Sequence, residues 1–96
     1  MQIEKESLSE FYSGTVTVSG TPVQIQAASL PLRKGVYLRV NELPAGLVSI
    51  GVNAAKAATG FTVKYGETSP LLYVDDLNKL WLRSSVPSTI VTWIAF

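Results

Sequence analysis

Two adjacent carboxylates, Asp75 and Asp76, are the residues whose types and spacing most readily suggest chemistry. They lie in VDDLNKLWLRSS, where paired acids could act as general acid and base or bind Ca²⁺ or Mg²⁺. Acid–base catalysis needs two carboxyls in distinct environments, but adjacent residues of a strand point to opposite faces and diverge. A Ca²⁺ loop needs roughly six to eight oxygens, and this stretch adds only Asn78. DDLN is instead typical of a turn, because Asp and Asn accept hydrogen bonds from nearby backbone N–H groups.

Three serines, Ser84, Ser85 and Ser88, are the candidate nucleophiles. The chain contains no His and no Cys, which excludes a His-based triad, a Cys nucleophile and the usual nitrogen and sulfur ligands of zinc. Neither GxSxG nor SxxK surrounds these serines, and we interpret them as loop residues near Pro87. The dispersed glycines form no phosphate-binding loop. We therefore predict that the protein is not an enzyme and that it holds no cofactor or metal.

Four aromatic residues, Tyr37, Tyr73, Trp81 and Trp93, could form a platform that stacks on sugars or bases. The alternative is that these side chains lie in the core or between subunits, and we favour this alternative. A nucleic-acid footprint is not expected, because the net charge is only +1 and no more than two basic residues are consecutive. Charged residues make up 16% of the chain, against about 25% in average soluble domains. This low charge suggests that a partner covers part of the surface.

The segments that must position these residues alternate between apolar and polar side chains, as strands with one inward face do. They are GTVTVS, PVQIQA, VYLRV, VSIGV and FTVKY, followed by LLYV, KLWLRSS and TIVTWIAF. Short turn sequences separate them, so we predict an all-β fold: one compact antiparallel sandwich or jelly roll of about seven to eight short strands. The strand order is not predicted.

Three connections between these segments carry finer predictions. NELPAG (41–46) predicts a hairpin between the third and fourth strands, and GETSP (66–70) predicts a turn before LLYV. NAAKAATG (53–60) has Asn53 as a possible N-cap, and it predicts a single turn or compact loop. TIVTWIAF is apolar on both faces, which fits either a central strand or a strand that another chain partly covers.

The chain is long enough for one domain, which we place at residues 11–96 after a polar N-terminal arm at residues 1–10. The arm does not read as a signal peptide, and no apolar run is long enough to predict a membrane span. We expect residues 1–13 to reach a neighbouring subunit or another surface, because apolar side chains stand among the polar ones. The candidate interface residues are Ile3, Leu8, Phe11, Tyr12, Trp81, Trp93 and Phe96.

The second half of the chain resembles small virion structural proteins of tailed bacteriophages. In TGFTVKYGETSPLLYVDDLNKLWLRSS, as in those chains, TG leads a strand, a G-E turn follows, and V-D-D-L-x-K-L precedes the next strand. GVYLRVNELPAGLVSIGVN resembles their preceding hairpin, although Ile50-Gly51-Val52 departs from their I-x-V-G order. VTWIAF resembles their last strand, so the resemblance spans residues 14–96.

This resemblance implies a non-enzymatic part of a phage virion, assembled in the bacterial host cytoplasm. A head decoration or cement protein fits best by size, with the major capsid protein or another virion protein as partner and a homo-oligomer, most often a trimer, as the assembled form. Tail, neck and fibre components belong to the same class. A glycan-binding or other ligand-binding module of a phage tail, fibre or adhesion apparatus is the alternative, and it requires Trp81, Trp93 or Tyr37 to be exposed.

Overall fold

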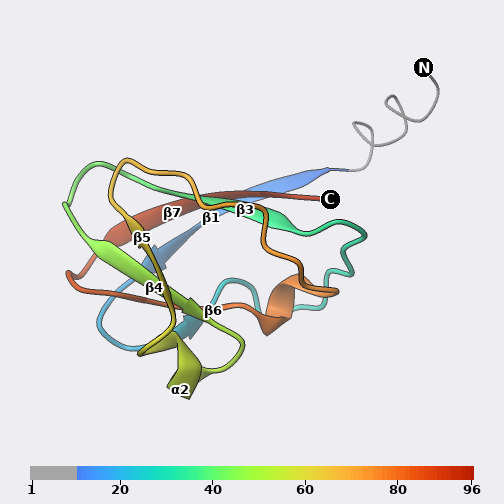
Figure 1. Cartoon of the computed structure of the whole chain (residues 1–96), viewed down its shortest axis with the longest axis horizontal. Coiled ribbons are helices and arrows are strands. Elements are labelled where there is room, and N and C mark those ends of the chain that lie inside the picture. Colours follow the sequence, from blue (N-terminus) through green and yellow to red (C-terminus); the bar gives the residue numbers. More distant parts are fainter. Residues whose placement is uncertain (1–10) are drawn as a thin grey trace.

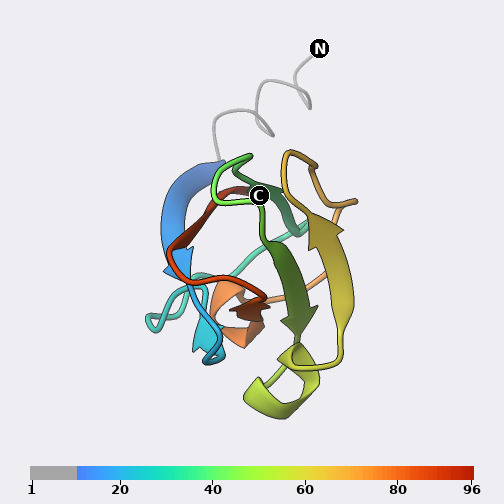
Figure 2. The same ribbon diagram turned by 90° about the vertical axis from the view of Figure 1, so that its left-hand side faces the viewer.

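The computed structural model describes residues 11–96, which form two antiparallel sheets packed face to face (Figures 1 and 2). The first sheet has the order β1-β7-β3, with β1 at Tyr12–Val18, β7 at Thr89–Ala95 and β3 at Val36–Val40. The second has the order β2-β6-β4-β5, with β2 at Val23–Gln24, β6 at Trp81–Ser84, β4 at Leu47–Gly51 and β5 at Phe61–Lys64. The predicted all-β sandwich is confirmed.

An eighth extended segment, residues 66–72, lies along the free side of β3. Ser69 N–H donates to the Leu38 carbonyl at 2.7 Å, and Leu72 and Val36 exchange two backbone hydrogen bonds. Its contacts with β3 are antiparallel bridges, not a continuous ladder, because Pro70 has no N–H to donate. With this segment counted, the first strand pairs with the last, the second with the next to last, and so on inward to β4 and β5. This is the connectivity of a jelly roll.

Two of the predicted connections were wrong. The NELPAG stretch is not a hairpin, because β3 pairs with β7 while β4 pairs with β5 and β6. It carries the chain from one sheet to the other and contains a cis Leu43–Pro44 peptide bond. The GETSP stretch is only in part a turn, since residues 67–69 already bond to β3. Alternation of side chains locates strands but says nothing about which strands pair.

Two of the predicted strands are also shorter in the structure. PVQIQA forms a strand only at Val23–Gln24, although Ile25 N–H still donates to the Leu80 carbonyl at 3.0 Å. Beyond Ile25 the chain bends away, and the Gln26 side chain bonds to the Ala28 carbonyl. LLYV forms no regular strand, because its part in the sheet is a single bridge at Leu72.

The core lies between the two sheets and is built from alternate residues of each strand. β3 buries Val36, Leu38 and Val40 and leaves Tyr37 and Arg39 on its other face. The core positions of the other strands follow the same period: Val18, Val48, Ile50, Val63, Leu82, Val91, Trp93 and Ala95. Residues outside the strands complete the core: Ile25, Leu32, Leu77 and Leu80. Each inward side chain removes apolar area from water, at roughly 25 cal/mol per Å². Alternation therefore predicts the buried face of β3, but in FTVKY, which contains β5, only Val63 is buried, whereas Phe61 and Tyr65 are exposed.

Two short helical turns complete the chain, and both follow the predictions. α2, at Ala54–Ala57, is a single turn whose N-cap Asn53 accepts a hydrogen bond from Lys56 N–H at 2.8 Å. The predicted DDLN turn is a 3₁₀ turn, η1, at Leu77–Lys79. Asp76 caps it, and Leu77 is fully buried, so the turn both reverses the chain and anchors it to the core.

Candidate interaction surface

The two carboxylates serve the turn and point to different partners. Asp75 forms an exposed ion pair with Lys79 at 2.7 Å. Asp76 accepts hydrogen bonds from the Ser29 hydroxyl, from Leu30 N–H at 2.9 Å and from Asn78 N–H at 3.0 Å. The Ser29 hydroxyl, followed by the two N–H groups, lowers the pKa of Asp76, and Lys79 lowers the pKa of Asp75. These contacts favour the ionised form of both carboxyls. Neither carboxyl therefore has the raised pKa that a general acid needs.

The three serines lie at or near the β6–β7 connection, and one of them is not a loop residue as predicted. Ser84 is the last residue of β6, and its side chain is buried. Its hydroxyl lies 2.6 Å from the Thr89 hydroxyl and accepts a hydrogen bond from Val86 N–H at 3.2 Å. Ser85 accepts a hydrogen bond from Leu47 N–H at 2.9 Å. Ser88 lies in the turn between β6 and β7 with φ 61°. The Ser84 hydroxyl therefore stabilises the β6–β7 connection, and the Ser85 hydroxyl links it to the start of β4.

The surface that nothing in the described chain covers is the outer face of the β1-β7-β3 sheet. The register places Ser13, Ile94 and Tyr37 in one row across the three strands. Thr15, Thr92 and Arg39 form the next row. We call this set of six residues the outer face. It explains why the last strand is apolar on both sides, since Trp93 and its inward neighbours enter the core while Ile94 does not.

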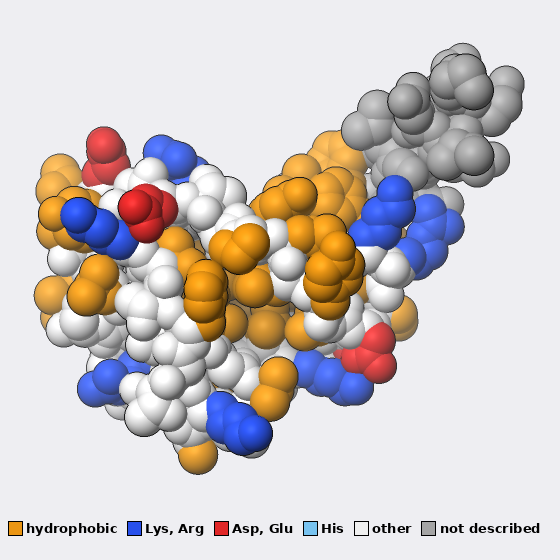
Figure 3. Space-filling view, viewed as in Figure 1, with side chains coloured by type: hydrophobic (Ala, Val, Ile, Leu, Met, Phe, Trp, Pro, Cys, Tyr) orange, Lys and Arg blue, Asp and Glu red, His pale blue; other side chains and the backbone are white. Residues whose placement is uncertain are grey.

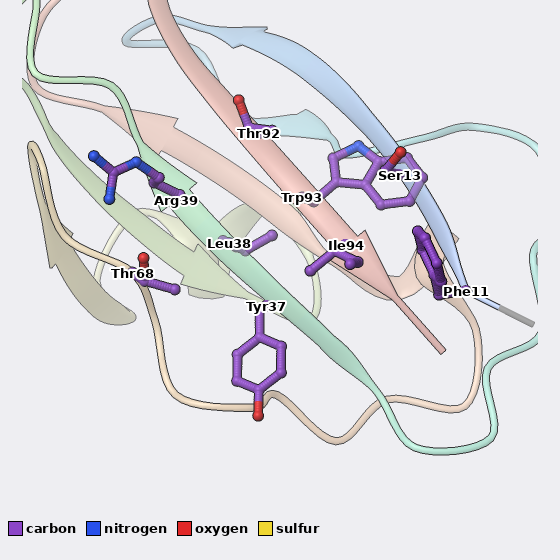
Figure 4. Close-up of a pocket in the computed structure, with 9 residues that line it drawn as sticks. All are labelled: Phe11, Ser13, Tyr37, Leu38, Arg39, Thr68, Thr92, Trp93 and Ile94. Carbon is purple, nitrogen blue, oxygen red and sulfur yellow. The ribbon is translucent and has the colours of Figure 1, made fainter. Parts of the chain in front are cut away.

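A shallow hollow of about 460 Å³ lies on the outer face, and Figure 4 shows the side chains around it. Its lining is Phe11, Ser13, Tyr37, Leu38, Arg39, Thr68, Thr92, Trp93 and Ile94. Phe11 directly precedes β1, Ile94 comes from β7 and Tyr37 from β3, and Figure 4 shows Ile94 between the two aromatic side chains. Hydroxyls and one guanidinium are the polar groups of the lining. The composition suits an apolar contact with a few directional hydrogen bonds.

The end of β7 fixes one side of this surface. The Phe96 ring meets the Tyr37 ring edge to face, with centroids 6.1 Å apart. The main-chain oxygen of Phe96 accepts hydrogen bonds from Arg33, Lys34 and Gly35 N–H, at 3.0, 2.7 and 3.0 Å. These bonds hold the aromatic pair in place at the edge of the outer face. Figure 3 shows hydrophobic side chains gathered near the start of the described chain, with basic side chains adjoining.

The predicted interface residues fall into four groups. Phe11 and Tyr12 are 47% and 48% exposed, and Phe96 is half-buried against Tyr37. Trp93 is 6% exposed and belongs to the core, where a Cβ at Gly14 would lie 2.6 Å from its ring. Trp81 is half-buried on β6, in the other sheet. Ile3 and Leu8 lie outside the described residues.

The residues of the hollow that sequence reasoning missed are Leu38, Arg39, Thr68, Thr92 and Ile94, whereas Tyr37 was already named as part of a possible platform. The signal for Ile94 was present, because TIVTWIAF is apolar on the face that does not enter the core. Arg39 alternates with buried residues of β3 and so could be placed outward, but not beside Ile94. Thr68 had no such signal, since its position depends on the return of residues 66–72 to β3.

Comparisons with family models, curated proteins and solved structures gave no match to this chain. Within residues 11–96, no helix is long and apolar enough to cross a membrane. The same residues bring together no group of three or more carboxylates that could hold a metal ion.

Proposed function

We propose that the protein is a non-enzymatic structural component of a phage particle, a capsid decoration or cement protein that binds the head lattice. The sequence resemblance to small virion proteins supports the class. The observation that carries the proposal is the outer face with its hollow, where Phe11, Tyr37 and Ile94 form an apolar surface that the described chain leaves open. In this proposal the major capsid protein, or another virion protein, covers that surface.

The surface has the make-up of a contact between folded proteins. Aromatic residues and Arg are enriched at the centres of such contacts, and Lys and Glu are depleted. The hollow contains two exposed or half-buried aromatic rings and Arg39, and it contains neither Lys nor Glu. It lies on a sheet backed by the buried core, so an incoming group would meet a surface that is already formed.

The test measures co-sedimentation with particles of the phage that encodes this chain, prepared without it. The variant combines Phe11→Ser with Tyr37→Ser, and the matched control is Phe61→Ser, an aromatic residue of similar exposure on β5 in the other sheet. Wild type and control should sediment with the particles. The double variant should bind at least about tenfold more weakly, as loss of buried aromatic anchors does. Circular dichroism checks that both variants fold.

Two outcomes would contradict the proposal. Failure of the wild-type protein to bind particles would remove the decoration role. Equal binding by the double variant and the control would place the contact elsewhere on the molecule.

A second candidate function is a binding module for a glycan or another ligand. The hollow favours it, because about 460 Å³ falls within the roughly 300–1,000 Å³ typical of ligand sites, and Tyr37 offers a ring for stacking. The burial of Trp93 weakens it, since that residue cannot form part of an exposed platform. A glycan array discriminates the two functions: hits that Tyr37→Ser abolishes and Phe61→Ser preserves support the binding module.

A further inference from the structure

β1 is an open edge of its sheet. It pairs with β7 along all seven of its residues. On the opposite side, residues 12–18 make no backbone hydrogen bond to any other segment of the described chain. In Figure 2, β1 lies at the outer margin of the molecule. An edge strand presents a row of unpaired N–H and C=O groups, which is a template for adding another strand.

The other three edges of the sandwich carry the features that prevent such pairing. β2 has only two residues, and β5 has four, ending in Lys64. Residues 66–72, at the far edge of the first sheet, include Glu67 and Pro70. Short length, charge and Pro are the usual protections of an edge strand. β1 has none of them, because FYSGTVTVSG (11–20) contains neither a charged residue nor a Pro.

The sequence of β1 is also complementary to itself. In an antiparallel pair of two copies centred on Thr15, that residue faces its own counterpart, Ser13 faces Thr17, and Gly14 faces Val16. Each of these pairs joins residues of the same sheet face, so outer and core-side residues stay in register across the contact. Hydroxyl groups meet on the outer side, and Thr–Thr and Ser–Thr pairs stabilise neighbouring strands. No like charges are opposed.

We propose that β1 binds the β1 strand of a second copy of this chain, antiparallel and centred on Thr15. The contact joins two three-stranded sheets into one continuous sheet and sets their outer faces side by side. It is isologous, so by itself it closes a dimer. It therefore differs from the trimer that the phage resemblance implies, and it does not depend on what the outer face binds.

The absence of Cys from the chain allows a direct test of register by disulfide cross-linking. Opposed residues of antiparallel strands lie about 4.5–5.5 Å apart at Cα, within the roughly 4.4–6.8 Å that a disulfide spans. Thr15→Cys should therefore form a linked dimer under mild oxidation. The matched control is Thr62→Cys, an exposed position on the β5 edge, which should link far more slowly. A mixture of Ser13→Cys and Thr17→Cys should cross-link faster than either variant alone.

A second measurement uses charge. Thr15→Lys places like charges directly opposite one another at the centre of the contact, and dimerisation should weaken at least about tenfold. Thr62→Lys should leave the native mass unchanged. Light scattering on a sizing column, over a range of concentrations, measures both, and circular dichroism confirms folding.

The proposal is overturned if Thr15→Cys links no faster than Thr62→Cys. A wild-type protein that is monomeric or trimeric at all concentrations would overturn it equally. Its failure is separable from that of the decoration role: a monomeric wild-type protein that binds particles would leave the role in place, whereas a wild-type dimer that binds no particles would leave only the strand contact.

Discussion

At the scale of single residues, Asp76 shows how a side chain that could do chemistry is used to hold the fold. Its carboxylate accepts from Ser29 and Leu30 on one segment and from Asn78 on another. It therefore links the loop before β3 to the turn before β6, and an antiparallel bridge between Pro31 and Asp76 lies at the same place. Three charge-assisted bonds on one carboxylate make this the most heavily bonded acid among the described residues.

These bonds predict an acid-sensitive contribution to stability. The pKa of Asp76 is lower in the folded chain than its usual value of 3.8, so near and below that value the unfolded state binds more protons than the folded state. Stability then rises with pH through this window and falls as the pH drops toward the folded pKa. Asp76→Asn should lower the melting temperature at neutral pH and flatten its decline in acid. Thermal melts from neutral pH down to about pH 2 measure both effects.

Asp75→Asn is the matched control for this prediction. The pKa of Asp75 is also lowered, but its main partner is the exposed Lys79 side chain, and exposed ion pairs contribute little. The melting temperature at neutral pH should change less in this variant than in Asp76→Asn. Equal changes in the two variants would contradict the anchoring role of Asp76.

At the scale of elements, residues 66–72 behave as a strand because a side chain takes the place of a backbone acceptor. Leu38 N–H donates to the Ser69 hydroxyl at 2.9 Å, and that hydroxyl donates to the Pro70 carbonyl at 2.8 Å. Ser69 is buried, so both bonds lie away from water. A buried N–H without a partner is costly, which makes this hydroxyl necessary to the pairing of residues 66–72 with β3.

Ser69→Ala should therefore destabilise the protein by about 1–3 kcal/mol, the cost of a buried donor without an acceptor. Urea unfolding measures this change, and faster amide exchange at Leu38 identifies its source. Thr68→Ala, one residue earlier and exposed, should change stability by less than about 0.5 kcal/mol. Unaltered exchange at Leu38 in Ser69→Ala would show that the hydroxyl is dispensable.

The pairing of Ser69 with β3 is an example of a feature that the sequence does not predict. The positions of most strands, the inward residues of β3 and the DDLN turn follow from local alternation and turn chemistry, although LLYV forms no regular strand. Sheet partners do not follow, because an apolar face can be buried against any other apolar face. For this reason NELPAG was predicted to form a hairpin, and GETSP was predicted to form only a turn. The hollow depends on those pairings, so Phe11, Tyr37 and Ile94 could be listed but not brought together.

At the scale of the whole molecule, the two surfaces open to partners meet at the start of β1. The outer face includes Ser13, the strand edge runs from Tyr12 to Val18, and Phe11 lines the hollow. Residues 1–10 enter the described chain at this corner. Their sequence contains Ile3 and Leu8 among three acids and one Lys, and it predicts that this segment contacts a neighbouring subunit or another surface.

Deleting residues 1–10 should therefore abolish particle binding, or self-association, while the domain still folds. The fold should persist because the core and both sheets are complete within residues 11–96. Particle co-sedimentation, native mass and thermal melting measure the three properties on the same sample. Ile3→Ser with Leu8→Ser is the matched variant, since it keeps the length and charge of the segment and removes only its apolar groups. Unchanged particle binding and native mass in the deletion variant would show that the partners contact the described domain alone. If the deletion variant loses particle binding and the double serine variant keeps it, the contribution of residues 1–10 comes from their backbone or charge.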